Sequence, residues 1–233
     1  MKSNRIIQIG LLLLTTIFIN TRLHAQSESS LGAFLAFPVG DFKSTDLENG
    51  GFAEQGWGIV FDSKTPINTR WALNSHSTYQ WNNMNTEKIG EALTNEIGFD
   101  TEISESRYSP LVTTLGLIYS LPIGEKVKIS PSGNAGVMFN NTKAFTIKIY
   151  DVSNNLLANE VVNFDNRVAF AYNFGVDLRF ELIENLLALS LYGDYTGAKQ
   201  KTEISIPSIS SFDSFQKLQY MNFGVKLAVT RQN

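Results

Sequence analysis

His76 is the residue around which hydrolytic chemistry would have to be built, because the other histidine, His24, lies in an N-terminal segment that we predict is removed. Its neighbours Ser75 and Ser77 carry the hydroxyl groups that a serine–histidine nucleophile requires. The surrounding residues alternate as in a β-strand, and successive strand residues point to opposite faces. His76 therefore cannot share a face with either serine, and we predict an inward-facing histidine that bonds to polar neighbours rather than a catalytic base.

Metal, cofactor and redox chemistry are not predicted either. The chain contains no cysteine, which rules out a disulfide scaffold and cysteine-based zinc or redox sites. With His24 removed there is no second histidine for a metal site, and no glycine-rich phosphate loop is present. We therefore predict no catalytic, cofactor-binding or metal-binding residue, and we expect that the protein is not an enzyme.

Three charged residues, Asp177, Arg179 and Glu181, stand two apart and so share one face of a strand. We interpret them as a network of opposite charges rather than an acid–base pair. They belong to residues 170–182, whose other face is wholly apolar: Phe170, Tyr172, Phe174, Val176, Leu178, Phe180 and Leu182. Charges are costly in a dry core, whereas bulky apolar side chains suit contact with lipid. This pattern predicts a strand of a membrane β-barrel.

Seven further segments alternate in the same way: residues 31–37, 56–62, 70–81, 111–121, 128–140, 187–196 and 220–230. The predicted fold is all-β, an eight-stranded antiparallel up-and-down transmembrane β-barrel with short periplasmic turns and long extracellular loops. The charged residues predicted to face its lumen are Asp62, Arg70, Lys128, Asp177, Arg179, Glu181 and Lys226. Eight strands enclose a space that side chains fill, so no open pore is expected.

The connections between these segments alternate in length. Long connections at 38–55, 82–109, 141–167 and 197–217 are separated by short turns at 63–68, 122–126 and 183–185. Outward aromatic residues fall into an outer group of Trp57, Tyr79, Trp81, Phe139, Phe170, Tyr172 and Tyr195 and an inner group of Phe61, Trp71, Tyr119 and Phe180. Such groups are typical of the two aromatic girdles at membrane surfaces.

The alternative fold is a soluble sandwich or lipocalin-like barrel, in which the apolar face would point to a core. It is disfavoured because rows of bulky aromatic residues would crowd the interior of a small barrel.

The N-terminus has the order of a secretory signal peptide, with Lys2 and Arg5 before an apolar run at 6–19 and a small residue, Ala25, at the predicted cut. We therefore divide the chain into a signal peptide, residues 1–25, and an outer-membrane β-barrel domain, residues 26–233. Cleavage removes three basic residues and no acidic one, so the formal charge falls from −3 to −6. An acidic chain of this kind is not expected to bind nucleic acid.

The long connections contain structure of their own. Residues 87–98 are compatible with a short helix, residues 144–152 and 159–164 with a hairpin turning at 153–155, and residues 201–206 with another strand. These strands would extend the sheet above the membrane and expose an edge able to pair with a partner strand. The alternative is a solvated loop that only stiffens the barrel rim.

The segment LGAFLAFPVGDF, residues 31–42, together with the eight-strand layout, resembles the small outer-membrane β-barrel domain family that includes OmpX-like and PorT-like proteins. The last strand, NFGVKLAV at 222–229, is similar to the β-signal read by the outer-membrane assembly machinery. The resemblance implies a location in the outer membrane of a Gram-negative bacterium. It implies a fold but no shared activity.

Two functions are compatible with this sequence. The first is a structural or surface-binding barrel with loops presented outside the cell, without catalysis or an open pore. The second is a barrel subunit of a protein-export or envelope-assembly machine, as in PorT-like proteins. The expected partners are outer-membrane lipid, the assembly machinery through the C-terminal strand, and a protein at the extracellular loops. No cofactor is expected.

Overall fold

The computed structural model describes residues 27–48, 50–206 and 210–230. These residues form thirteen strands in one antiparallel sheet, together with helix α2 (Thr86–Ile97) and a short 3-10 helix, η1 (Gly40–Phe42). Within the described ranges, no helix is long and apolar enough to cross a membrane. The predicted signal peptide, residues 1–25, lies outside the described residues.

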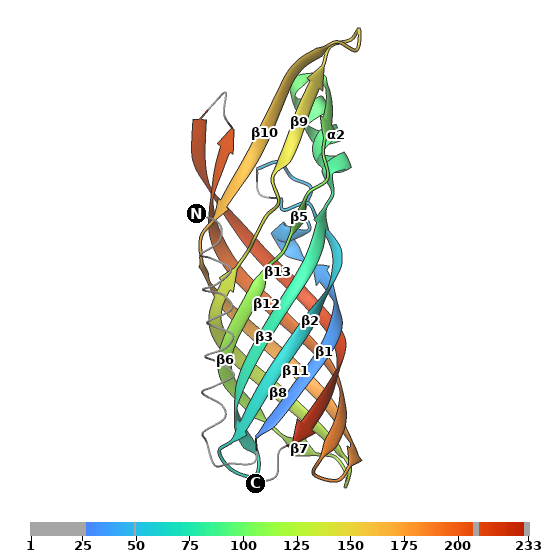
Figure 1. The fold of residues 1–233 in the computed structure, drawn as a ribbon, viewed down its shortest axis with the longest axis vertical. Helices are drawn as coiled ribbons and strands as arrows, with labels where there is room; N and C mark the ends of the chain where they lie inside the picture. Colours follow the sequence, from blue (N-terminus) through green and yellow to red (C-terminus); the bar gives the residue numbers. More distant parts are fainter. Residues whose placement is uncertain (1–26, 49, 207–209, 231–233) are drawn as a thin grey trace.

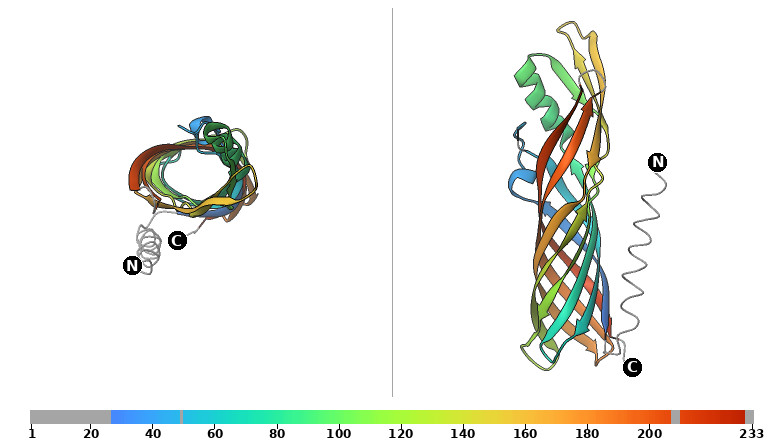
Figure 2. Two further views of the ribbon diagram at one scale, coloured as in Figure 1. Left: turned by 90° about the horizontal axis from the view of Figure 1, so that it is seen from above. Right: turned by 90° about the vertical axis from the view of Figure 1, so that its left-hand side faces the viewer.

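Eight of these strands close into a ring. They are β1 (Glu28–Pro38), β2 (Ala53–Pro66), β3 (Trp71–Met84), β6 (Leu111–Tyr119), β8 (Val127–Phe139), β11 (Ala169–Ile183), β12 (Leu187–Ile206) and β13 (Ser210–Thr230). They pair in the order β11-β8-β6-β3-β2-β1-β13-β12, and β12 pairs back to β11. Figure 2 shows this ring along its axis. Within the ring every strand has two neighbours, so no edge is left open there.

Five further strands raise the count above the eight predicted: β4 (Asp100–Ile103), β5 (Arg107–Tyr108), β7 (Leu121–Pro122), β9 (Phe145–Tyr150) and β10 (Leu156–Asn166). Strand β7 continues β6 beyond Ser120 and pairs with β8. The other four lie in the long connections predicted at 82–109 and 141–167. Figure 1 shows β9, β10 and α2 standing above one end of the barrel.

The prediction of a loop at 197–217 is wrong. Strands β12 and β13 pair without interruption from Leu187 and Val229 to Ile206 and Ser210, so both barrel strands continue above the ring. The strand predicted at 201–206 exists, but as the end of β12. The alternation of apolar and polar residues stops at 197–217, so the pattern that predicted the other strands was absent there.

The outer surface of the ring is apolar. Phe170 is 67% exposed and Leu31 is 63% exposed. Large apolar residues of the other ring strands are exposed in the same way, among them Leu35, Trp57, Ile59, Leu73, Leu115, Leu117, Phe174, Val176, Leu191, Phe223, Val225 and Leu227. An exposed apolar surface of this extent is foreign to soluble monomers. The soluble-barrel alternative is therefore contradicted, and the outward direction predicted for these apolar residues is confirmed.

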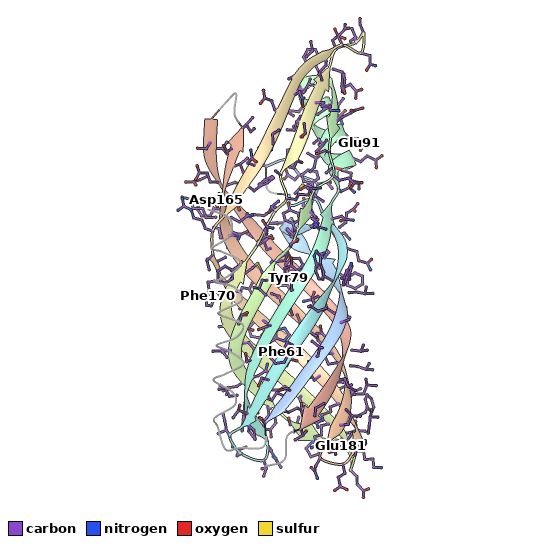
Figure 3. The ribbon with its side chains drawn as sticks, viewed as in Figure 1. Phe61, Tyr79, Glu91, Asp165, Phe170 and Glu181 are labelled. Carbon is purple, nitrogen blue, oxygen red and sulfur yellow. The ribbon has the colours of Figure 1, made fainter. Side chains whose placement is uncertain are left out.

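Aromatic residues of the predicted outer group contact one another. The ring centroids of Trp57 and Trp81 lie 4.4 Å apart, and those of Tyr79 and Trp81 lie 4.6 Å apart. In the predicted inner group, Trp71 and Tyr119 lie 4.7 Å apart. Figure 3 shows Glu181 at the end of the barrel with the short turns, whereas Glu91 lies above the other end.

The hairpin predicted across residues 153–155 is confirmed. Strands β9 and β10 pair from Phe145 and Val162 to Tyr150 and Leu156. At its tip, the Asp151 carboxylate accepts hydrogen bonds from the Asn155 side chain and backbone and from the backbone of residue 153. These bonds, that of the Asn155 side chain above all, lower the pKa of Asp151 from its ordinary value. The tip is therefore an ordered turn.

Candidate functional site

A chain of alternating charges crosses the half of the lumen that is nearer to the short turns. Lys226 Nζ lies 2.6 Å from Asp62 Oδ2 and 2.7 Å from Asp177 Oδ1. Lys64 Nζ lies 3.0 Å from Asp177 Oδ2 and 3.3 Å from Glu28 Oε1. Glu28 is also paired with Arg179. We call these six residues of β1, β2, β11 and β13 the charge network.

The backbone makes room for this network. Gly32 of β1 is the Cα partner of Lys226 on one side and of Val60 on the other. A Cβ atom on Gly32 would collide with the Lys226 side chain and with the carbonyl of Val225. The glycine therefore lets the lysine reach across β1 to Asp62 on β2, a close approach that is a usual reason for glycine within a strand.

The charged residues that were predicted to face the lumen lie in three different environments. Asp62, Asp177, Arg179 and Lys226 come together in the network. Lys128 and Glu181 are half-buried near the short turns. The prediction for Arg70 is wrong, because this residue precedes β3 in an exposed turn and its Nη1 donates to Tyr119 Oη.

Glu28 and Lys64 were missed by the sequence analysis. The predicted first strand began at Leu31 and the predicted second strand ended at Asp62, so both residues fell outside. The signal was present, because Glu28 shares the parity of Gly32, and Lys64 shares that of Asp62.

His76 is buried in the lumen, as predicted. Its Nδ1 lies 2.6 Å from Asp62 Oδ1, and its Nε2 lies 3.8 Å from Asp194 Oδ2, too far for a hydrogen bond. The hydroxyl of Ser30 donates to Asp62, and the hydroxyl of Ser77 donates to Thr113. In the described part of the chain, no serine hydroxyl is hydrogen-bonded to His76, so the geometry lacks the nucleophile–base contact of a serine hydrolase.

Side-chain amides fill the lumen beside the network. Asn74 donates to Asn134, Asn134 to Asn173, and Asn173 to Thr196, at distances of 3.2, 3.1 and 2.9 Å. The cavity left between these residues and the charge network has a volume of about 10 Å³. A single water molecule needs about that much space. The lower lumen is therefore packed with side chains.

A buried apolar cluster, which we call the plug, lies at the other end of the barrel. Phe42 of η1 is fully buried, and its ring packs edge-on against Tyr108 and Tyr220, with centroids 4.8 and 4.9 Å apart. The Tyr108 hydroxyl donates to the Gly51 carbonyl at 2.7 Å and accepts from Gln216 Nε2. The β1–β2 connection, predicted only as a loop, thus buries Phe42 against Tyr108 and Tyr220 at the barrel mouth.

A five-stranded sheet rises above this plug, in the order β13-β12-β10-β9-β4. Strand β10 joins it to the barrel through pairs from Asn163 and Ser205 to Asn166 and Thr202. Three buried apolar residues, Ile89 of α2, Phe145 of β9 and Val162 of β10, belong to one hydrophobic cluster and connect the helix to the sheet. Figure 2 shows the helix standing beside this sheet. We call α2 and these five strand segments the upper module.

Helix α2 confirms the helix predicted at 87–98. The Asn85 side chain accepts from the Lys88 backbone, and the helix ends at Gly98, which has a φ of +73°. The backbone N–H of Thr101 in β4 donates to Thr94 Oγ1 of the helix at 3.1 Å. The helix therefore covers the outer edge of β4, as proteins often protect an edge strand.

The opposite edge of the upper module is open. Strand β1 pairs with β13 only over Tyr220–Thr230, so none of the described strands pairs with residues 211–218 on the side away from β12. The Val39 backbone donates to the Gln219 carbonyl, which places the polar backbone groups of Gln219 on that side. Alternate residues of an antiparallel strand repeat this orientation. The backbone groups of residues 211, 213, 215 and 217 therefore point to the open side.

In the described ranges, no group of three or more histidine, aspartate or glutamate residues is arranged to hold a metal ion.

No protein-family model and no curated protein matches the sequence. Among solved structures, the outer membrane protein OprG from Pseudomonas aeruginosa is similar over 89% of this chain and 98% of its own, with 12% identity and a TM-score of 0.51. The outer membrane protein AlkL matches with 15% identity over 90% and 91% of the two chains and a TM-score of 0.49. A major outer membrane protein from Thermus thermophilus matches with 13% identity over 88% and 99% and a TM-score of 0.48.

The likeness to OprG shows the fold of this chain, which is that of small outer-membrane β-barrel proteins. The resemblance of residues 31–42 implied the same fold.

Proposed function

We propose that this chain is an outer-membrane β-barrel of a Gram-negative bacterium that is sealed to solutes and holds a binding sheet outside the cell. Its membrane unit is the ring of eight strands β1, β2, β3, β6, β8, β11, β12 and β13. The short turns face the periplasm and the upper module faces outward, as in barrels of this kind. The role is binding rather than catalysis. The open edge of β13 is the observation that carries this proposal.

Two barriers in series support a sealed lumen. The apolar plug around Phe42 lies at the mouth, and the charge network around Lys226 lies below it. An ion would have to displace both layers, and each consists of buried side chains that contact one another.

The protein is therefore expected to give no steady conductance when it is reconstituted into planar lipid bilayers. Brief, irregular current fluctuations are compatible with this expectation. Reproducible single-channel current steps whose number scales with the amount of folded protein would contradict it. A sixteen-stranded porin in the same membrane serves as the positive control.

The open edge offers backbone hydrogen bonds to an extended peptide. Strand addition to a sheet edge gains affinity from main-chain bonds and specificity from alternate side chains. Asp213, Phe215 and Lys217 stand on the outward face of this edge, and Phe215 is 62% exposed. We therefore propose that a partner protein contributes a strand beside residues 211–218.

Phe215→Pro should weaken this pairing strongly, while Phe215→Ala should largely preserve it. Proline removes a backbone N–H that points to the open side, whereas alanine removes the same aromatic ring and keeps the N–H. A photoreactive residue at Ser211 in intact cells should give an adduct of defined mass. We expect its yield to fall about tenfold in the proline variant, since one lost bond and a steric block act together.

Equal yields from the proline and alanine variants would refute backbone pairing at this edge. Absence of any adduct in the otherwise unchanged chain would refute the partner itself.

The alternative function, a barrel subunit of an export or envelope-assembly machine, would use the same edge permanently. Purification in mild detergent separates the two: a machine subunit brings partners in fixed stoichiometry, whereas a surface receptor loses its ligand when cells are washed. We favour the receptor because the edge belongs to the upper module, at the end of the barrel away from the short turns (Figure 1).

A further inference from the structure

A groove of about 700 Å³ lies on the side of the barrel, between the β1–β2 connection and the first turn of α2. Its apolar wall includes Phe37, Val39 and Ala53, and its polar rim includes Lys43 and Lys88. The volume is within the range of sites for small organic ligands. An apolar wall with a cationic rim is the surface that an anionic amphiphile requires.

The groove begins where the lipid-facing surface ends. Phe37 is the last residue of the outward row of β1, and its ring lies 6.0 Å from that of Phe223, an exposed residue of β13. Two residues earlier in that row, Leu35 is the Cα partner of Trp57, a member of the outer aromatic group. Aromatic girdles mark the level at which acyl chains give way to headgroups. The groove therefore opens to lipid headgroups.

The two lysines at the rim are not neutralised. Neither the Lys43 nor the Lys88 ammonium group has a hydrogen-bond or ion-pair partner among the described residues. Glu54 is the one acidic residue that lines the groove. By contrast, Lys217 is paired with Asp41 at 2.7 Å, so an acid beside the groove is already engaged. The rim has an excess of positive charge, which favours an anion with more than one oxygen.

We propose that this groove binds the phosphorylated headgroup of an outer-leaflet lipid. The phosphate lies between Lys43 and Lys88, and the acyl chain runs down along Phe37 and Val39 toward the membrane. The lipid holds the β1–β2 connection against the start of α2, so it links the membrane surface to the upper module. This inference does not depend on the proposed protein partner.

The test uses the full-length protein in detergent and native mass spectrometry with phosphatidic acid as the probe. We expect one tightly retained phosphatidic acid per chain, and at least roughly tenfold weaker retention in the Lys43→Gln/Lys88→Gln variant, because each lysine near a lipid surface contributes to anion attraction. Lys199→Gln is the matched control, because Lys199 is an exposed lysine outside the groove that lies over the Phe215 ring. Its retention should equal that of the unchanged protein.

Two competitors separate the sources of the ligand. Phosphatidylcholine should compete poorly, and inorganic phosphate at equal concentration should not displace the lipid. The proposal is overturned if the double lysine variant binds phosphatidic acid as well as the unchanged protein does. It is also overturned if inorganic phosphate displaces the lipid completely, which would mean an anion site without a lipid role.

Discussion

Lys226→Met is expected to destabilise the barrel by about 3 to 5 kcal/mol, the usual cost of leaving a buried charge without its partner. Lys226 is 3% exposed and contacts two carboxylates, Asp62 and Asp177. Methionine has a similar length but no charge, so both acids would lose their closest cation. The change should appear as a lower denaturant midpoint of the refolded protein in detergent.

The control is the neighbouring residue on the other face. Val225 is 49% exposed toward lipid, so Val225→Ala should cost less than about 1 kcal/mol because lipid fills the space left by the methyl groups. A second variant tests the mechanism: adding Asp62→Asn to Lys226→Met should recover part of the lost stability, since the two residues are in direct contact. An unchanged midpoint for Lys226→Met would mean that water or ions already screen the network.

Phe42→Ala is expected to open the β1–β2 connection without unfolding the barrel. Removing a fully buried phenylalanine costs about 3 to 5 kcal/mol, and the loss falls on a segment outside the ring. The Phe52 backbone N–H, which donates to the Ser44 carbonyl at 3.0 Å, reports this opening. Its hydrogen exchange should accelerate on the order of a hundred-fold or more.

Leu47→Ala is the matched control in the same connection, because Leu47 is exposed and its loss should leave the exchange of Phe52 unchanged. Amides of β11, on the opposite part of the ring, should exchange at the same rate in both variants. If Phe42→Ala left the Phe52 amide protected, the aromatic contacts with Tyr108 and Tyr220 would not be what holds the plug in place.

Alternation of residue type was enough to predict most strands of the ring and their faces. In residues 170–182 the polar parity holds Asp177 and Arg179, and the structure places both inside β11 while Phe170 and Phe174 face outward. This succeeds because strand periodicity is a local property and because lipid and lumen are two very different solvents. Helix α2 was predictable for a similar reason, because the residue that ends it, Gly98, is a local signal in the sequence.

The same criterion failed where the strands left the membrane. Strands β12 and β13 continue through 197–217, although their residues no longer alternate between apolar and polar. Beyond the lipid, backbone hydrogen bonds to the neighbouring strand hold a strand in place, and its residues need not alternate between apolar and polar. The prediction for Arg70 failed for a related reason. Its parity fits a strand, but the residue lies in the turn before β3.

The sequence by itself determined the class of fold, the lipid-facing surface and the inward direction of His76, Asp62 and Lys226, because all of these follow from local spacing. Tertiary structure alone decided that Arg179 pairs with Glu28, 151 residues away, and that Phe42 packs against Tyr108 at the mouth. It also decided that the edge of β13 stays open while α2 covers β4. These features depend on the register between strands and on how connections fold over them, and both are set by contacts between residues distant in sequence.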